Sequence, residues 1–236
     1  MMRWNVLGSV RVPIKGSVFC LAVLALLLGG AGQAKAGLLW YSGDSDGIAS
    51  LINQNNVQSY NIVYNGFNVT GSGWYVGSVW SNDVFQSGPP VSTTATWAIL
   101  SNLPTGTLVA SGDGVATLTT TGFTFEGFPE YQVLVSGLSV YLAPGTYWLA
   151  VYPDNTNGGI ASKDTTSGAN AVGTSPGANY VSTDGGNTFL GPTGNTGSAG
   201  IEGVATAAPE PASLTLLGIG IPGIAGYGWR RRKLAA

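Results

Sequence analysis

Histidine is absent from this chain of 236 residues, and cysteine occurs only once, at Cys20. A chain without histidine lacks the side chain that most often serves as a general base and as a metal ligand. Cys20 lies in an apolar stretch near the N-terminus, so the rest of the chain has no thiol for a disulfide or a nucleophile. These absences exclude histidine- and cysteine-dependent catalysis and leave packing to stabilise the fold.

Basic residues are also scarce in the body of the chain, residues 37–208, where Lys163 is the only one. The body carries ten acidic residues against this single base, which gives a net charge of −9. Such a surface cannot neutralise phosphates, so nucleic acid is excluded as a partner. Lys163 could form a Ser–Lys catalytic pair, but its polar neighbours predict a solvated loop lysine instead.

The N-terminus has the order of a secretory signal peptide. Basic residues come first, and an uninterrupted apolar run follows at residues 18–28. Ala34 and Ala36 then form an A-x-A cleavage site, so we expect a signal helix over residues 1–36, cut before Gly37. The apolar run is too short to span a bilayer comfortably, which makes an uncleaved anchor the lesser alternative.

The C-terminal segment, residues 209–236, combines a short polar signal, an apolar span and a cluster of cations. Residues 212–229 carry no charge and predict a transmembrane helix of roughly 27 Å, just long enough to cross the hydrocarbon layer. Four cations follow directly and predict a stop-transfer signal that keeps the C-terminus cytoplasmic. A buried helix of a soluble domain is the alternative. The four cations are Arg230, Arg231, Arg232 and Lys233.

The polar signal that opens this segment is Pro209-Glu210-Pro211. Its position before an apolar span and an arginine cluster resembles the PEP-CTERM sorting domain, found on exported proteins of Gram-negative bacteria that make extracellular polysaccharide. The resemblance implies that an exosortase, a membrane enzyme similar to a transpeptidase, recognises Pro209, Glu210 and Pro211 and removes the tail. These three residues would then be a substrate site and not a catalytic one.

The body alternates between apolar and polar residues in short runs that Gly, Pro, Asn and Asp clusters separate. This pattern predicts an all-β, antiparallel sandwich over residues 37–192. One short helix is expected at residues 48–54, and residues 193–208 are expected to form a flexible linker of low complexity. The expected strands include 74–80, 94–100, 115–121, 130–142 and 146–152, with short closing strands at 160–162, 179–183 and 188–190.

The body also resembles ectodomains that often precede such tails. The matching stretches include residues 64–74, 81–83, 95–97 and 142–149. The resemblance implies a jelly-roll-like β-sandwich, and it brings no established activity or site.

An oxygen-rich stretch, Asp44-Ser45-Asp46-Gly47, is the first candidate binding site. Asp44 and Asp46 are hard oxygen ligands of the kind that Ca²⁺ prefers, but the bidentate glutamate of an EF-hand does not follow them. Asp and Gly also form ordinary turns by bonding their own backbone, and this is the favoured interpretation. We expect no cofactor beyond at most one structural calcium ion at Asp44 and Asp46.

Aromatic residues are the second candidate site, because aromatic faces stack on sugars. In a strand over residues 74–80, alternation would place Trp74 and Trp80 on one face, where they could bind carbohydrate. The alternative is that the tryptophans fill the core, and burial of all of them would favour it. The tryptophans of the body are Trp40, Trp74, Trp80, Trp97 and Trp148.

Glu126 and Glu130 are the only close pair of glutamates in the chain. Two carboxylates at a set distance can hydrolyse a glycosidic bond. The Gly-Phe-Pro turn between them predicts that both face solvent, so we expect no catalysis there and no enzyme activity in the chain.

Taken together, the residues predict an exported, exosortase-sorted protein of the envelope or extracellular matrix. We expect it to be non-enzymatic and to have a structural or adhesive role in a polysaccharide matrix such as a biofilm. A carbohydrate-binding β-sandwich module, with or without structural calcium, is the alternative. The expected partners are the membrane, an exosortase and extracellular polysaccharide. The expected location is the inner membrane during sorting, then the cell surface or the surrounding medium.

Overall fold

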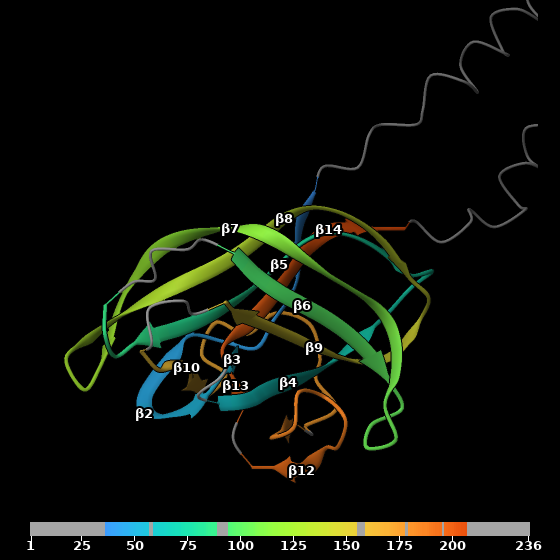
Figure 1. The fold of residues 1–236 in the computed structure, drawn as a ribbon. Coiled ribbons are helices and arrows are strands. Elements are labelled where there is room, and N and C mark those ends of the chain that lie inside the picture. Colours follow the sequence, from blue (N-terminus) through green and yellow to red (C-terminus); the bar gives the residue numbers. More distant parts are fainter. Residues whose placement is uncertain are drawn as a thin grey trace, which may run out of the picture. The chain divides into compact units, whose positions relative to one another are not determined.

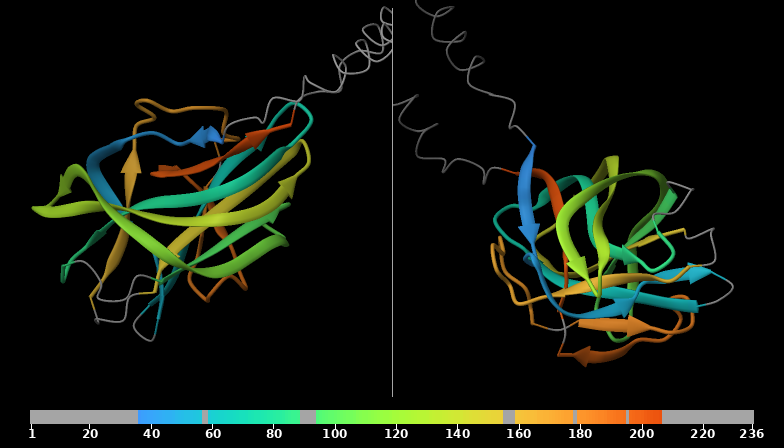
Figure 2. Two further views of the ribbon diagram at one scale, coloured as in Figure 1. Left: turned by 90° about the horizontal axis from the view of Figure 1, so that it is seen from above. Right: turned by 90° about the vertical axis from the view of Figure 1, so that its left-hand side faces the viewer.

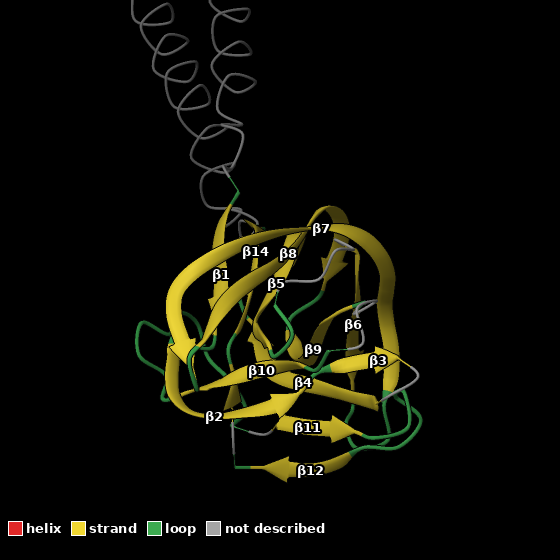
Figure 3. Cartoon of the chain, turned by 60° about the vertical axis from the view of Figure 1, so that its left-hand side comes forward, coloured by secondary structure: helices red, strands yellow, loops and turns green. Residues whose placement is uncertain are grey.

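The computed structural model describes residues 36–56, 59–88, 94–154, 159–177, 179–194 and 196–206, and these residues form strands and loops with no helix (Figures 1 and 3). The prediction of an all-β, antiparallel fold is therefore confirmed for this part of the chain. The strands are β1 (Gly37–Tyr41), β2 (Ser45–Ile52), β3 (Gln54–Asn56), β4 (Ser59–Val69), β5 (Trp74–Phe85), β6 (Thr94–Ser101), β7 (Thr107–Phe125), β8 (Phe128–Leu142), β9 (Gly145–Pro153), β10 (Ala161–Thr166), β11 (Asn179–Ser182), β12 (Leu190–Thr193), β13 (Thr196–Gly197) and β14 (Ala199–Ala205).

One long strand, β7, turns the sheet back on itself. The main strand order is β1-β14-β5-β8-β7-β6-β9-β4-β11-β12. The first part of β7 pairs with β6, and its later part pairs with β8, so β7 carries the hydrogen bonding from one layer into the other. The layer of β14, β5 and β8 therefore lies over the layer of β6, β9 and β4, an arrangement that fits a β-sandwich (Figures 1 and 2).

The main core fills the space between these two layers. Alternate side chains of each strand point inward, as Trp97 and Ile99 do on β6 and Leu149 and Val151 on β9. Full burial of each such side chain contributes roughly 1.5–3 kcal/mol. Phe67 sits at the centre of an aromatic group, with its ring centroid 5.5 Å from that of Trp40 and 6.1 Å from that of Trp74.

A second, smaller core lies on the other face of β4, β6 and β9. It contains Tyr64, Leu100, Trp148 and Tyr152, and Phe189 packs against it from the loop before β12. Because each face of these strands packs against a core, apolar side chains occur on both faces. The predicted closing strands near residues 160, 179 and 190 correspond to β10, β11 and β12.

The helix predicted at residues 48–54 is wrong. Residues 45–52 form strand β2, which pairs antiparallel with β10, so that Leu51 lies opposite Lys163. Ile48, the first apolar residue of the predicted helix, is exposed. A short apolar pattern does not distinguish helix from strand, and here the partner strand, far along the chain, decides.

The flexible linker predicted at residues 193–208 is also wrong for most of its length. Residues 199–205 form β14, which lies between β1 and β5 and is bonded to both. Gly200 faces the ring of Trp80, and a Cβ atom at this position would overlap that ring. The small residues of this stretch therefore allow close packing, although their composition is typical of a flexible segment.

Several predicted features lie outside the described residues. These are the signal helix up to residue 35, including Ala34, the transmembrane span 212–229, the Pro209-Glu210-Pro211 signal and the cations at 230–233. Gly37, expected as the first residue after cleavage, is the first residue of β1. In the part of the chain that the structure describes, no helix is long and apolar enough to cross a membrane.

Candidate functional site

The two tryptophans predicted to bind carbohydrate are both buried, with Trp74 4% and Trp80 5% exposed. They also do not share a face of β5, because a bulge interrupts the pairing with β8 between Val76 and Ser78. Trp74 lies in the main core together with Val79, whereas Trp80 lies on the other face. Neither ring offers an open face to a sugar, so the hypothesis that Trp74 and Trp80 form a binding platform is wrong. Trp40, Trp97 and Trp148 are buried too.

Asp44, between β1 and β2, and Asp46, at the start of β2, are the predicted calcium ligands, and both have hydrogen-bond partners within the protein. The Tyr41 hydroxyl donates to Asp44 Oδ1 at 2.9 Å, and Asn170 Nδ2 donates to Asp44 Oδ2 at 2.6 Å. The Ile48 amide at 3.0 Å and the Thr165 hydroxyl at 2.7 Å both donate to Asp46 Oδ1. The bonds from Tyr41 and Ile48 are local, as in an ordinary turn, whereas those from Asn170 and Thr165 come from distant parts of the chain. Within the described residues, no three His, Cys, Asp or Glu side chains are grouped to hold a metal ion. Calcium at this loop stays a prediction.

Lys163 is fully buried on β10, so the prediction of a solvated loop lysine is wrong. It lies directly opposite Asp83 of β5, and its ammonium group donates to the carbonyl of Val63 at 3.5 Å. Burial lowers the pKa of Lys163 to about 8, against the opposing effect of the Asp83 charge. Burial likewise raises the pKa of Asp83 to about 6, while Lys163 and hydrogen bonds from Ser81 and Asn53 oppose the rise. The lysine is thus the internal counter-charge of Asp83.

The glutamate pair is separated by the structure. Glu126 lies exposed in the turn between β7 and β8, whereas Glu130 is fully buried on β8, so the prediction that both face solvent is wrong for Glu130. The buried carboxylate of Glu130 meets Asp164 of β10 instead. Burial is the largest cause that raises the pKa of Asp164 to about 8; the neighbouring Glu130 carboxylate adds to it, because it can accept a hydrogen bond only from the protonated form of Asp164 and because its charge repels the ionised form.

The Glu130–Asp164 pair shares one face with Asn82 of β5. Asn82 and Val84 point to the same side of β5, Val84 pairs with Glu130, and Val84 also pairs with Ser162, two residues before Asp164. Around this point the Ser45 hydroxyl donates to Asp164 Oδ2 at 3.2 Å. We call Asn82, Glu130 and Asp164 the acid chamber.

The chamber joins residues that are far apart in the chain, and sequence reasoning did not find it. Glu130 alternates with the core residues Val133 and Val135 of β8, so its position predicts a side chain that faces away from the core, and nothing in the sequence marks it as buried. Asp83, on the opposite face of β5, is not part of the chamber. It is spaced in step with the core residues Val79 and Phe85, and this spacing could have predicted that Asp83 is buried. The rest depends on the pairing of β5 with β8 and β10.

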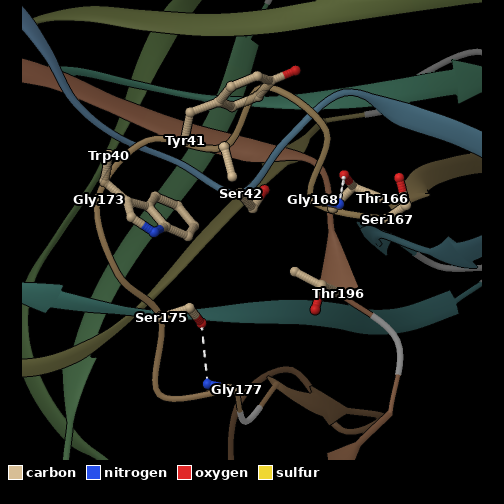
Figure 4. Close-up of a pocket in the computed structure, with 11 residues that line it drawn as sticks. Trp40, Tyr41, Ser42, Thr166, Ser167, Gly168, Gly173, Ser175, Gly177 and Thr196 are labelled. Atoms are coloured by element: carbon tan, nitrogen blue, oxygen red, sulfur yellow. Dashed lines mark hydrogen bonds between the residues drawn. The ribbon is translucent and has the colours of Figure 1, made fainter.

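A cavity of about 200 Å³ lies between the end of β1 and the loop after β10 (Figure 4). Its lining combines the indole of Trp40 with hydroxyl groups, among them Ser42 and Thr196. Two other lining hydroxyls form hydrogen bonds within the loop: that of Thr166 accepts from the Gly168 amide, and that of Ser175 accepts from the Gly177 amide. None of the described residues that line the cavity is Asp, Glu, Lys or Arg; the titratable group among them is Tyr41, whose hydroxyl donates to Asp44 Oδ1.

A family model matches the tail of the chain. The family model of the PEP-CTERM protein-sorting motif matches residues 207–233. No curated protein matches the chain. The chain thus carries a PEP-CTERM sorting motif, as the order of its C-terminal parts predicts, and the motif begins directly after the last described residue.

Proposed function

We propose that this protein, which its PEP-CTERM motif marks for export and sorting by an exosortase, has a structural or adhesive role in the cell envelope or polysaccharide matrix. The sorting motif is the single observation that carries the proposal, because it sets the destination of a body that is a tightly packed β-sandwich. A body of this kind suits a surface or matrix protein, since a hydrogen-bonded sheet with a full core resists unfolding outside the cell.

We further propose that the body has no catalytic activity. The side chains considered for catalysis do not form an accessible pair: Lys163 and Glu130 are buried, opposite Asp83 and beside Asp164, and Glu126 is exposed in a turn away from Glu130. General acid–base chemistry needs a titratable group that can reach a substrate. This arrangement favours a structural role over hydrolysis.

The sorting step can be tested with a variant that replaces Pro209, Glu210 and Pro211 by alanine. We expect mass spectrometry of cell fractions to find the wild-type protein without its tail, at the surface or in the medium. The variant is expected to accumulate with its tail in the membrane fraction. Gly194→Ala, which lies before the motif in open space, is the matched control and should be processed like the wild type. Release of the triple variant without its tail would contradict the proposal.

A second candidate function, carbohydrate binding, is favoured by an exposed pair of tyrosines. Tyr75 of β5 and Tyr141 of β8 lie opposite each other, 53% and 47% exposed, with their ring centroids 5.1 Å apart. The Tyr141 hydroxyl donates to the carbonyl of Ser72 at 2.8 Å, which fixes the ring in place. Rigid, half-exposed aromatic rings of this kind can stack on the apolar face of a sugar.

Polar groups lie beside these rings on the same surface. Ser78 of β5 is opposite Glu202 of β14, and the serine hydroxyl donates to the Glu202 carboxylate at 3.1 Å. Glu202 is exposed, and a carboxylate near aromatic rings is a group that sugar hydroxyls bind, whereas Ser78 is buried and holds this carboxylate in place. The acidic charge of the body favours neutral sugars over anionic ones.

The test is binding of neutral and acidic polysaccharides to the wild type and to Tyr75→Ala/Tyr141→Ala. Loss of two stacking partners should weaken binding of a neutral glucan at least about tenfold, the effect of roughly 1.4 kcal/mol. Tyr60→Ala is the control, because Tyr60 is similarly exposed on a different strand, β4. Equal binding by the double variant, or no binding of any neutral glucan by the wild type, would count against this function and leave the sorting proposal intact.

A further inference from the structure

The acid chamber contains buried oxygen atoms that receive no hydrogen bond. Both carboxylate oxygens of Glu130, Oδ1 of Asp164 and Oδ1 of Asn82 are buried and have no partner among the described residues. Buried polar atoms are nearly always paired in folded proteins, because an unpaired one loses its hydration without gaining a partner, and the loss is larger when the atom is charged. Four such acceptors on one face of the sheet point to a missing positive partner.

No side chain of the body can supply that positive charge. Lys163 is the only basic residue between residues 37 and 208, and it is committed to the opposite face. There it lies opposite Asp83, whose side chain follows the parity of the main core, and it donates to the Val63 carbonyl. Two ionised carboxylates left together in a buried site repel each other and lose their hydration.

A single proton does not satisfy the chamber. If either carboxyl group is protonated, Glu130 and Asp164 can form one hydrogen bond with each other. This bond uses two of the four unpaired oxygens and leaves the amide oxygen of Asn82 and one glutamate oxygen without a donor. A single cation, in contrast, can be coordinated by all four unpaired oxygens at once.

We propose that the acid chamber binds one calcium ion, with the carboxylates of Glu130 and Asp164 and the amide oxygen of Asn82 as ligands. All of these donors are oxygens, which calcium prefers, and calcium tolerates the irregular geometry that three strands impose. Two carboxylates balance its charge. The Ser45 hydroxyl, already bonded to Asp164, lies within the same group. The site needs only two acids, so it agrees with the lack of any three-acid group in the described residues.

The ion would join strands that are distant in the sequence. Its ligands come from β5, β8 and β10, and Ser45 belongs to β2, which pairs with β10. Asp44 and Asp46 lie near the acid chamber. The Tyr41 hydroxyl, which donates to Asp44, is close enough to Glu130 for their charges to interact. Thr165, next to Asp164 in the chain, donates to Asp46. Nearby carboxylates raise the local concentration of cations. Extracellular calcium modules work at dissociation constants of about 10⁻⁴–10⁻³ M, which suits an exported protein.

The experiment uses the full-length chain, purified in detergent and stripped with a chelator, with calcium chloride as the probe. Millimolar calcium should raise the melting temperature by about 3 °C or more, and equilibrium dialysis should find one ion per chain. The rise should be larger near pH 8.5 than near pH 5, because protons compete for the carboxylates. Magnesium should have less effect, since it demands stricter octahedral geometry.

Two variants locate the ion. Glu130→Gln and Asp164→Asn keep the side-chain shape and remove a buried charge, so both should fold, and both should lose the response to calcium. Glu126→Gln, the exposed neighbour in the turn, should keep it. The proposal is overturned if the wild type shows no calcium response, or if either chamber variant responds as the wild type does.

Two further results would assign the chamber differently, and each would overturn the proposal. Loss of the response in Asp44→Asn/Asp46→Asn, with retention in Glu130→Gln, would place the ion in the β1–β2 loop. A wild type that ignores calcium but loses stability as the pH rises would mean that the chamber holds a shared proton.

Discussion

At the scale of single residues, this protein is defined by charges that it buries. Lys163, Asp83, Glu130 and Asp164 are all fully buried, although such groups are almost never buried unless they are paired. Their burial raises the pKa of both aspartates and lowers that of the lysine. The stability of the body therefore depends on how these groups are neutralised.

Replacing Lys163 by methionine tests the first of these pairs. The substitution leaves Asp83 buried without its counter-charge, and we expect the free energy of unfolding to fall by about 3–5 kcal/mol. Urea denaturation measures this loss. Adding Asp83→Asn to the same chain removes the unpaired charge and should restore part of the stability. A single variant as stable as the wild type would show that Lys163 does not neutralise Asp83.

The buried acids also predict how stability changes with pH when calcium is absent. The pKa of Asp164 is about 8 in the folded chain, so the folded chain keeps this proton up to about pH 8, whereas the unfolded chain releases it near the ordinary aspartate pKa of 3.8. Asp83 acts in the same direction up to about pH 6. Because the folded state binds more protons in this window, stability should fall as the pH rises.

Lys163 acts in the opposite direction above this window. Its pKa falls from 10.5 to about 8 on folding, so the unfolded state holds more protons between these values and stability should rise with pH. We therefore expect a minimum of stability near pH 8 in excess chelator, measured by urea denaturation at a series of pH values. In Asp164→Asn the decline toward pH 8 should be smaller; a decline as steep as in the wild type would show that another group causes it.

At the scale of single elements, β14 shows how small residues permit close packing. Gly200 lies opposite Trp80 in the pairing of β14 with β5, and the indole covers the position of its missing side chain. The bulge near Val76 turns Trp80 toward this strand and away from the main core. The glycine and the bulge are therefore two parts of one arrangement.

Gly200→Ala should destabilise the protein by about 1–3 kcal/mol, because the added methyl group overlaps the ring of Trp80 and forces it to move. Thermal or urea denaturation measures the effect. Gly194→Ala is the control, since no atom lies within 4 Å of the added carbon. If both variants melted together with the wild type, the close approach of Gly200 to Trp80 would not be a constraint.

At the scale of the whole molecule, the chain closes its sheet with its last strand before the sorting motif. β14 bonds to β1, at the start of the body, and to β5, in the middle of the sheet. Residues 199–205, predicted as part of a linker, are consequently part of the fold.

A truncation series tests this point. A chain ending at residue 198 keeps β12 and β13 but lacks β14, which leaves the edges of β1 and β5 unpaired, so it should fail to fold cooperatively or should aggregate. A chain ending at residue 206 keeps all the described strands and should melt as the full-length protein does. Circular dichroism and size-exclusion chromatography distinguish the two. A folded, monomeric shorter chain would show that β14 is dispensable.

The sequence alone determined the local features of this protein. The alternation of apolar and polar residues predicted an antiparallel β fold, because the two faces of a strand are occupied by alternate residues along the chain. The order Pro-Glu-Pro, apolar span and arginines predicted the sorting motif that the family comparison finds at residues 207–233. The apolar span and the signal peptide stay predictions, as does the jelly-roll likeness.

Only the tertiary structure decided which residues meet. The strand at residues 45–52, the pairing of β14, the separate faces of Trp74 and Trp80 and the meeting of Glu130 with Asp164 all depend on partners far along the chain. Residues that bury a charge or approach a ring look the same in sequence as residues of a solvated turn or a flexible linker. Burial of a residue depends on which strand packs against it, and this strand cannot be identified from the neighbouring residues in the sequence.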